Sequence, residues 1–584
     1  MLWRLLRAAF EPRSSAALLV SRALDLRGQG HFAEAERVLR SAVERYPGDA
    51  VAATNLAVAL LEQDRGKEAV GLLERAIESD PHCAAAHFNY AHLLRVTGRL
   101  PEAITHYRAA KTADPQFAAA PEELMQTLLE ACDWDGAQAQ ADELRGRIAH
   151  TPPSVWMRYM SPLTATYLGL AREQCKAVAT FHAERAVPQW GGAVRGGGRP
   201  RSGDGAAVAP GRAQRERIRI GYFSRDFRDH PIGHVLRGVF SLHDRSRFAI
   251  HAFSFGPDDR SEYRRIIANS VDVFVDLAAH SDEQAARTIA AAGIDILVDL
   301  MGHTTGNRLG VLARRPAPVQ AHYLGYAGTT GAPYIDYFLS DEIVTPQHLH
   351  ADFSEELAYI PECFMVSDGT QVRGAISSTR SAEKLPGDGY VFANFGNSSR
   401  ITREVFGLWM QILRAVPGSV LWLKRAHTLV VENLEREART AGVDAQRLIF
   451  AERLAEKTGH LGRLALADLA LDTIGWYNGH SSSADMLWAG VPVLTAPGDT
   501  FASRVAASLV GAAGLQQWIA KDAEEYVATA VRLGTDPAQS AALRSALGAA
   551  RASAPFFDTA HLVWGLETAY EAMFAAKMHR SAGL

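Results

Sequence analysis

The sequence predicts an α + α/β protein in which an N-terminal helical solenoid precedes two doubly wound α/β domains. Three observations support this. Several residue types recur with a period of 34 within the first 150 positions. A segment rich in glycine, arginine and proline follows at 190–216, and is expected to be a flexible linker. Beyond it, short apolar runs alternate with helix-length segments, the pattern of parallel sheets covered on both faces.

Composition excludes several classes of protein. A chain of 584 residues with 47% hydrophobic and 22% charged residues is typical of a soluble protein with several domains. A net charge of -4 gives no electrostatic reason to expect nucleic acid as a partner. The four cysteines lie far apart without a CxxC pair, so neither a disulfide framework nor a zinc site is expected. A reducing, cytoplasmic location fits this use of cysteine best. No apolar run is long enough for a membrane span, so no membrane association is expected.

The period of 34 predicts helix pairs within residues 1–150. The recurring positions are Pro47, Pro81 and Pro115; Ala35, Ala69 and Ala103; Ala42, Ala76 and Ala110; Leu39, Leu73 and Tyr107; and Asn55 and Asn89. Each proline ends a helix pair, and the small residues let two helices approach closely. The pattern resembles the tetratricopeptide repeat, with repeats at 16–49, 50–83 and 84–117 and a degenerate fourth near 118–149. Such repeats stack into a solenoid with a concave face.

The remaining chain is divided into connecting helices at 151–189, a first α/β half at 217–380 and a second α/β half at 381–584 that includes the terminal helices. Expected strands of the first half are 218–223, 248–255, 271–276, 295–300 and 318–324. Those of the second half are 390–395, 419–424, 447–450, 469–473 and 492–496. Ligands of two such sheets bind between the carboxyl ends of their strands.

The sharpest motif is NGHSSSADMLWAG at 478–490, between an expected strand and a helix. Ser481 and Ser482 would stand at the positive end of that helix, a ready site for a pyrophosphate. Asp485, one turn further on, would accept hydrogen bonds from ribose hydroxyls. The alternative is a serine-rich helix cap without a ligand.

Basic residues follow two strand ends of the same half. Lys457, His460 and Arg463 have the spacing i, i+3, i+6 and are expected to share one helical face. Arg400 stands beside Asn397 after another strand. Together they would converge on a diphosphate. The alternative is a solvated basic surface.

Two motifs of the first half also follow strands. SRDFRDHPIGH at 224–234 contains His230 and His234 with two aspartates, and a histidine there would act as a general base or hold an acceptor hydroxyl. The alternative is capping and packing. In RRPAPVQAHYLGYAGTTGAP at 314–333, Gly325 would allow the backbone to approach a sugar closely.

The motifs DFxxHPxxH, RPAPVQ…LGYxGTxGA, NGHSSSAD and LWAGVPVLTAPGDTFASRVAAS together resemble the family of TPR-linked protein O-GlcNAc transferases, including the plant SPINDLY-like members. The resemblance covers nearly the whole chain. It implies a two-Rossmann (GT-B type) fold and inverting transfer of GlcNAc from UDP-GlcNAc to Ser or Thr, without a required metal.

The resemblance also implies roles for particular residues. It places His230 and Arg400 in catalysis. Its donor-binding positions are Asn397, Arg400, Lys457, His460, Arg463, His480, Ser481, Ser482, Asp485 and Gly325. The chain departs from the family at Arg400, where the family has lysine, and at Ala327, where it has proline. Arginine keeps the charge but changes its reach, so the identity of the donor sugar stays open.

Neither a metal nor another cofactor is expected. The only Asp-x-Asp triplet is Asp133-Trp134-Asp135, inside the helical array and away from any strand end. Arg400, Lys457 and the helix N-terminus would then stabilise the departing diphosphate by fixed charge.

Protein or peptide acceptors are expected to bind the concave face of the solenoid. Asn55 and Asn89 recur at an inward helix position where amides can bind a peptide backbone. The alternative is that they are a common polar position of the repeat.

The sequence therefore predicts an enzyme that transfers GlcNAc from UDP-GlcNAc to protein Ser or Thr. Two alternatives remain. One is a relative that uses UDP-glucose or GDP-fucose, or that acts on asparagine. The other is a TPR scaffold with a degenerate transferase. An NAD-dependent enzyme is disfavoured because no GxGxxG follows a strand.

Overall fold

The computed structural model describes residues 15–28, 31–63, 65–117, 119–187, 216–372 and 378–582. The chain divides into two compact units, one made of Met1–Thr164 with Ala426–Leu434, the other of Ala165–Arg425 with Glu435–Leu584. The linker expected at 190–216 lies outside the described residues except for its last residue.

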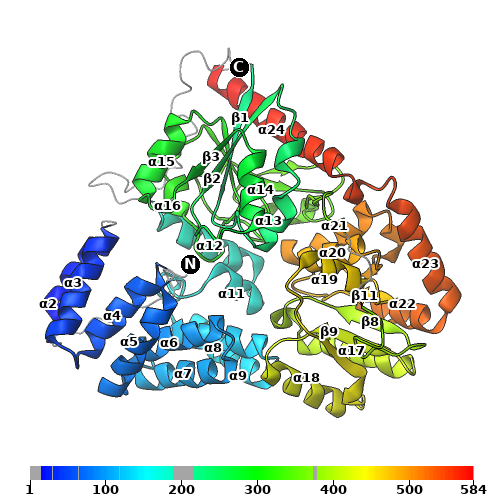
Figure 1. Ribbon diagram of the computed structural model, residues 1–584, viewed down its shortest axis with the longest axis horizontal. Helices are drawn as coiled ribbons and strands as arrows, with labels where there is room; N and C mark the ends of the chain where they lie inside the picture. The colour runs from blue at the N-terminus through cyan, green and yellow to red at the C-terminus, as the bar shows by residue number, and fades with distance from the viewer. Residues whose placement is uncertain are drawn as a thin grey trace. The chain divides into compact units, whose positions relative to one another are not determined.

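The first unit consists of antiparallel helix pairs (Figure 1). They are α2 (Ala17–Gly28) with α3 (Phe32–Arg45), α4 (Ala50–Leu61) with α5 (Gly66–Ser79), α6 (Ala84–Val96) with α7 (Leu100–Ala113), and α8 (Ala119–Glu130) with α9 (Trp134–His150). The second helices of the four pairs begin at residues 32, 66, 100 and 134. The period of 34 is therefore confirmed, and it extends to the degenerate fourth repeat.

The recurring small and large residues form the core of this unit. Ala42, Ala76 and Ala110 are each 0% exposed, as are the large residues Leu39, Leu73 and Tyr107. Alanine at the crossing brings the two helices of a pair close together, and the large side chain fills the space beside it. The small-and-large pattern seen in the sequence is the packing pattern of the helix pairs.

The first unit ends later than the expected boundary at 150. Glu122 of α8 accepts hydrogen bonds from the backbone N of Ser161 at 2.9 Å and from Oγ1 of Thr164 at 2.6 Å. These bonds hold the segment after α9 and α10 (Pro153–Trp156) on the repeats. Asn433 of α18 (Thr428–Thr440) likewise donates to the carbonyl of Ala131 at 2.8 Å, which places 426–434 in this unit.

The second unit contains two parallel sheets. The first has seven strands in the order β3-β2-β1-β4-β5-β6-β7. They are β1 (Ile218–Ser224), β2 (Phe248–Ser254), β3 (Val273–Asp276), β4 (Ile296–Asp299), β5 (Val319–His322), β6 (Tyr337–Ser340) and β7 (Glu356–Tyr359). Helices of this half include the end of α11 (Pro162–Tyr167), α12 (Arg172–Glu184), α13 (Pro231–Leu236), α14 (Glu262–Ser270), α15 (Asp282–Ala291) and α16 (Leu309–Leu312).

The second sheet has five strands in the order β10-β9-β8-β11-β12. They are β8 (Val391–Asn394), β9 (Val420–Lys424), β10 (Leu448–Ala451), β11 (Leu469–Leu471) and β12 (Val493–Leu494). Helices of this half are α17 (Arg403–Ala415), α19 (Lys457–Leu464), α20 (Ser481–Trp488), α21 (Val505–Ala512), α22 (Ala523–Thr535) and α23 (Pro537–Ala550), with most of α18. Every strand predicted from the sequence is present, and the two-Rossmann expectation is confirmed.

Two strands of the first sheet, β6 and β7, were not predicted. A parallel crossover normally passes through a helix, but no helix lies between β5 and β6 or between β6 and β7, only turns and a 3₁₀ helix. The sequence pattern of alternating strand and helix is therefore absent there.

The terminal helix α24 (Thr559–Ala582) belongs to the first half by its contacts, although the sequence placed it with 381–584 (Figure 1). Tyr570 of α24 shares a hydrogen bond of 3.0 Å with Tyr222 of β1, and Glu567 lies 3.0 Å from Nδ1 of His243. Because these polar groups are buried, they hold the helix on the first sheet.

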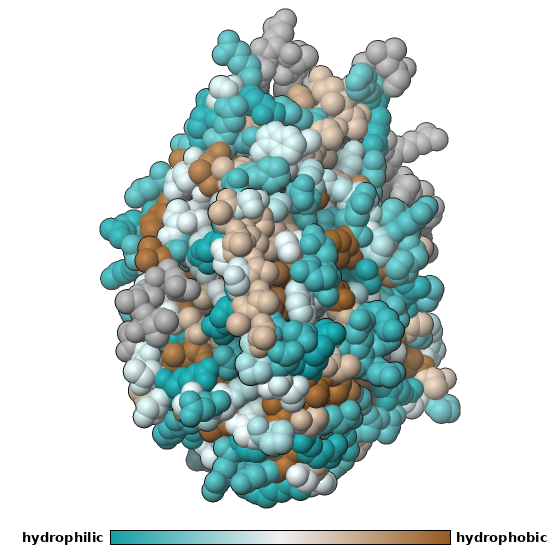
Figure 2. All heavy atoms as spheres, turned by 90° about the vertical axis from the view of Figure 1, so that its right-hand side faces the viewer, coloured by the Kyte–Doolittle hydropathy of each residue, from teal (hydrophilic) through white to brown (hydrophobic). Residues whose placement is uncertain are grey.

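The outer face toward α22, α23 and α24 is largely hydrophilic, crossed by a band of weakly apolar residues (Figure 2). Of α23, the alanine-rich helix on this side, only Leu543 and Leu547 are buried. No helix among the described residues is both long and apolar enough to span a bilayer.

Overpacking a helix crossing tests the repeat assignment. Ala76→Phe should lower the free energy of unfolding by about 1–3 kcal/mol, because the fully buried site has no room for a ring. The measurement is denaturant unfolding followed by helical circular dichroism. Glu78→Phe, at an exposed position of the same helix, is the control and should have little effect. Equal midpoints for the two variants would contradict the assignment.

Candidate functional site

The strand orders locate the ligand edge of each sheet. The order reverses between β1 and β4 in the first sheet and between β8 and β11 in the second. Ligands of such sheets bind at the carboxyl ends of the strands at these switch points. The segments 224–234, 396–400 and 478–483 follow β1, β8 and β11, so three of the predicted motifs lie at switch points.

The serine loop, defined as residues 478–483, is organised by a buried carboxylate. Asp472, directly after β11, accepts hydrogen bonds from the backbone N of Gly479 at 2.7 Å, Oγ1 of Thr495 at 2.7 Å and Oγ of Ser483 at 3.3 Å. Burial raises the pKa of Asp472 to about 7. The carboxylate thus determines where the chain turns and where α20 begins, at Ser481.

Arg400 reaches the serine loop from the end of β8. Its Nη1 donates to the carbonyl of Asn478 at 3.0 Å, and its guanidinium lies 4.0 Å from the centre of the Tyr477 ring. Arg400 therefore supports the loop and places a positive charge beside it. Asn397 is exposed and accepts a hydrogen bond from the backbone N of Ser399 at 3.1 Å, so it caps the 3₁₀ turn that carries Arg400.

His480 joins the serine loop to the segment 496–508. Its ring stacks on Tyr477 with centroids 4.8 Å apart, and Nε2 lies 3.1 Å from the carbonyl of Ala502. A carbonyl only accepts, so Nε2 carries the proton. Burial, with a contribution from Arg400, lowers the pKa of His480 to about 3, so the ring is neutral.

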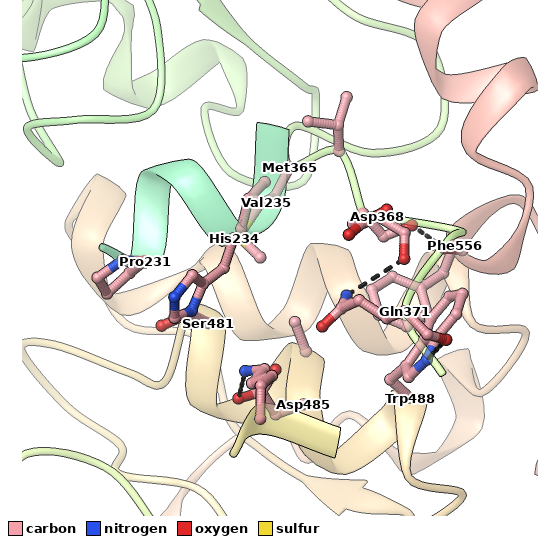
Figure 3. Close-up of a pocket in the computed structure, with 14 residues that line it drawn as sticks. Pro231, His234, Val235, Met365, Asp368, Gln371, Ser481, Asp485, Trp488 and Phe556 are labelled. Carbon is pink, nitrogen blue, oxygen red and sulfur yellow. Dashed lines mark hydrogen bonds and ion pairs between the residues drawn. The ribbon is translucent and has the colours of Figure 1, made fainter. Parts of the chain in front are cut away.

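A cavity of about 120 Å³ opens between the two α/β halves (Figure 3). It is lined by Pro231, His234, Val235, Met365, Val366, Ser367, Asp368, Gln371, Lys457, Ser481, Ala484, Asp485, Trp488 and Phe556. One side comes from α13 and the segment 365–371, and the other from α19 and α20. The cavity therefore has a charged part at α19 and α20 and an apolar part around Trp488.

Lys457 and Asp485 form an ion pair within this lining. Their side chains are 21% and 17% exposed, so both charges remain accessible from the cavity. A ligand that offers an anion to Lys457 and hydroxyl donors to Asp485 would replace this internal pair with two charge-assisted contacts. Together with Ser481 at the start of α20, the arrangement suits a nucleoside diphosphate.

The structure corrects the prediction that Lys457, His460 and Arg463 form one basic face of α19. Lys457 lines the cavity, but Arg463 is 2% exposed, lies 3.9 Å from Glu383 and is positioned over the Phe395 ring. Burial also lowers the pKa of His460 to about 4, and its ring lies 5.6 Å from that of Phe395. The helix is packed against the end of β8, so Arg463 faces inward rather than sharing an exposed face with Lys457.

The structure separates the two histidines of the 224–234 motif. His230 caps α13, with Nδ1 3.3 Å from the backbone N of Ile232 and 3.5 Å from Oδ2 of Asp226. His234 lines the cavity instead, with Nε2 2.7 Å from Oδ1 of Asp229. Burial lowers the pKa of both histidines. The sequence singled out His230, whereas His234 is the histidine of the cavity wall.

Gly325 allows its turn to lie very close to another segment of the protein. A Cβ at this position would lie 2.1 Å from the carbonyl oxygen of Leu300. Glycine is therefore required where the turn after β5 is pressed against the end of β4. This corrects the expectation that a sugar imposes the glycine.

Asn55 and Asn89 do not present their side-chain amides on an exposed surface. Both are 0% exposed, and their Nδ2 atoms donate to the carbonyls of Val51 and Ala85, each at 2.8 Å. Each amide bonds to the preceding turn of its own helix, which is the structural role that the repeat position allows. This corrects their expected presentation to an acceptor peptide.

Several residues that line the cavity were not predicted from the sequence as part of a site. Asp368 is fully buried and paired with Arg237 at 2.7 Å, and Gln371 accepts a hydrogen bond on its backbone carbonyl from Nε1 of Trp488 at 3.2 Å. Trp488 lies in the 478–490 motif and could have been found there. Asp368, Gln371 and Phe556 lie in segments without a motif, and only the tertiary structure brings them to the cavity (Figure 3).

No group of three or more His, Cys, Asp or Glu side chains is arranged to hold a metal ion within the described ranges. Independence from metal stays a prediction from the sequence.

Comparison with known sequences matches both parts of the chain. The model of Glycosyl transferase family 41 matches residues 207–377 and 369–566, and a tetratricopeptide repeat model matches 20–72 and 54–116. The probable UDP-N-acetylglucosamine–peptide N-acetylglucosaminyltransferase SEC of Arabidopsis thaliana is 36% identical over 365 residues, covering 62% of this chain and 37% of that protein. The Caenorhabditis elegans UDP-N-acetylglucosamine–peptide N-acetylglucosaminyltransferase is 28% identical, with 59% and 39% covered. The chain thus spans about two fifths of the length of these relatives.

Among solved structures, a mutant of the Thermobaculum terrenum O-GlcNAc transferase superposes with a TM-score of 0.68 at 26% sequence identity. The match covers 97% of this chain and 98% of that one. It includes the helical repeats as well as both α/β halves.

Acid should weaken the serine loop through His480. Its pKa is about 3 when folded and about 6.5 when unfolded. The unfolded state binds more protons between these values, so the stability is fully present above about pH 6.5 and is lost as the pH falls toward 3. Between about pH 6.5 and pH 5, the free energy of unfolding should fall by about 2 kcal/mol.

His480→Asn keeps an N–H for the Ala502 carbonyl but cannot titrate. Denaturant midpoints measured near pH 7 and pH 5 should therefore fall less in the variant than in the wild type. The same fall in both proteins would show that His480 is not the titrating group.

Proposed function

Since the chain belongs to glycosyl transferase family 41, we propose that it transfers N-acetylglucosamine from UDP-GlcNAc to Ser or Thr hydroxyls of protein acceptors. The observation that carries this proposal is the charged cavity between the α/β halves, where Lys457, Asp485 and the start of α20 meet at a switch point. The names of the relatives support the choice of donor.

The donor nucleotide is held by the second half. Lys457 and the N-terminal end of α20 at Ser481 bind the diphosphate, and Asp485 accepts hydrogen bonds from the ribose. Arg400 supports the serine loop through the Asn478 carbonyl and adds positive charge behind it. These charges are fixed before the reaction, so they stabilise the departing diphosphate without reorganisation.

In the transfer step, the acceptor oxygen attacks C1 of the sugar on the face opposite the diphosphate. The bond between C1 and the diphosphate oxygen breaks, its electron pair leaves with UDP, and the hydroxyl proton passes to a base. His230 is our candidate for assistance on the acceptor side. His234, with Nε2 2.7 Å from Oδ1 of Asp229, lines the same cavity as Lys457 and Asp485.

The helical repeats bind the protein acceptor through their concave face, because stacked repeats provide an extended surface for peptides. Buried Asn55 and Asn89 maintain the repeats in this proposal rather than contacting the peptide. A cytoplasmic location, and the absence of a nucleic-acid or membrane partner, stay predictions from the sequence.

Release of the nucleoside diphosphate, UDP or GDP, from a panel of sugar nucleotides tests the function. With a protein acceptor, UDP-GlcNAc should be consumed faster than UDP-glucose or GDP-fucose, and EDTA should leave the rate unchanged, because fixed charges replace a metal. Preference for another donor would contradict the sugar assignment. No turnover with any donor would favour a degenerate transferase, and loss in EDTA with recovery by Mn²⁺ would contradict the fixed-charge mechanism.

Removing a positive charge in or behind the proposed diphosphate site should weaken UDP binding. Lys457→Ala and Arg400→Ala are each expected to cost about 1.5–3 kcal/mol, or about 10- to 150-fold in affinity by calorimetric titration. Lys521→Ala, which removes an exposed lysine of the same half, should leave the affinity unchanged. Wild-type affinity in both Lys457→Ala and Arg400→Ala would exclude this cavity as the nucleotide site.

A further inference from the structure

Two neighbouring strands of the first sheet end in a buried ion pair. Asp299 is the last residue of β4 and His322 the last residue of β5, and the two are partners in the strand register. Their side chains are 2% and 0% exposed, and Nδ1 of His322 lies 2.9 Å from Oδ2 of Asp299. The pair lies next to the switch point between β1 and β4.

Both ring nitrogens of His322 lie beside oxygen atoms. Nε2 of His322 lies 3.1 Å from the carbonyl oxygen of Tyr326, which only accepts hydrogen bonds. The Asp299 side chain also accepts from the backbone N of Met301 at 3.2 Å and of Gly302 at 2.7 Å. The His322 ring therefore bridges Asp299 and the Tyr326 carbonyl.

The pair holds a turn in a strained conformation. In the turn defined as 324–328, Leu324 has φ +65°, a region that a non-glycine residue rarely adopts. Gly325 is pressed on Leu300, and the backbone N of Gly328 donates to the carbonyl of Tyr326 at 3.1 Å. Such a conformation persists only where its surroundings hold it. The hydrogen bond from His322 to Tyr326 is a restraint of this kind from outside the turn.

The turn follows β5 at the ligand edge of the first sheet. Burial raises the pKa of Tyr326, and Tyr477, directly before the serine loop, is near enough to add a smaller contribution in the same direction. The Tyr326 ring also meets His303 edge-on at 5.4 Å, and Nε2 of His303 donates to the carbonyl of Thr330 at 2.7 Å. The turn and the residue before the serine loop therefore lie near each other at the ligand edges of the two sheets.

We propose that the Asp299–His322 pair is a positioning element that sets the 324–328 turn against the sugar of the donor. It touches neither substrate nor reacting atoms and acts through the Tyr326 carbonyl. This inference rests on the proposed function. Because UDP is held by the second half, the pair should affect binding of the sugar nucleotide but not of UDP alone.

The test combines a substitution that should loosen the turn with a second substitution that should tighten it again. His322→Gln cannot bridge Asp299 and the Tyr326 carbonyl with the same geometry, so the turn should loosen. Ala327→Pro should tighten it again, because proline restricts φ at the centre of the turn and the preceding residue as well. No hydrogen bond of the Ala327 N–H is found among the described residues, so the proline removes none.

We expect His322→Gln to raise KM for UDP-GlcNAc by about 10- to 100-fold, as for a misplaced binding group, and to leave the calorimetric affinity for UDP unchanged. His322→Gln/Ala327→Pro should recover most of the loss. His348→Gln, at an exposed histidine of the same half, is the matched control. An equal loss for UDP and UDP-GlcNAc, or no recovery with proline, would overturn the proposal.

A second readout does not need activity. Amide hydrogen exchange in residues 324–330 should be faster in His322→Gln and return toward wild type with Ala327→Pro, whatever sugar the enzyme uses. Unchanged exchange in His322→Gln would overturn the proposal, whereas a lack of turnover in the wild type would count against the proposed function alone. If His322→Gln does not fold, Asp299→Asn/His322→Gln removes both charges together and is measured in its place.

Discussion

The buried carboxylate of Asp472 is the constraint on which the second half of the site depends. A carboxylate out of water is costly unless hydrogen bonds satisfy it, and here Gly479, Ser483 and Thr495 supply them. Satisfying Asp472 bends the chain after β11 into the serine loop and starts α20 at Ser481. The desolvation that raises the pKa of Asp472 is thus linked to the geometry of the serine loop.

The first half uses the same principle at a different strand end. Asp299 also accepts backbone N–H groups of the chain that follows it, but its further partner is the ring of His322. In both halves a carboxylate at a strand end directs the next few residues toward the ligand edge. Buried polar groups that are fully hydrogen-bonded specify one arrangement, which is what a preorganised site requires.

Two carboxylates of the cavity lining have cationic partners within the protein. Lys457 is paired with Asp485, and Arg237 with Asp368. The proposed binding of a nucleotide would therefore exchange one partner for another instead of filling a site of uncompensated charge.

The sequence by itself determined the repeats, all but two strands and the position of each loop relative to a strand. These features are local, because periodicity and apolar runs depend only on neighbouring residues. It also identified the serine loop and Lys457, since a motif after a strand must lie at the ligand edge of a parallel sheet. β6 and β7 were not predicted because the helix that normally marks a crossover is absent before each of them.

Only the tertiary structure decided which way each side chain faces. The i, i+3, i+6 spacing could not show that Arg463 is turned against Phe395 while Lys457 lines the cavity. The HPxxH spacing could not show that His234, not His230, reaches the cavity, nor could the recurrence of Asn55 and Asn89 show their burial. Asp368 and Gln371 meet α20 only because two halves of the chain close on one another. Burial depends on what packs against a residue, and those neighbours lie far away in the sequence.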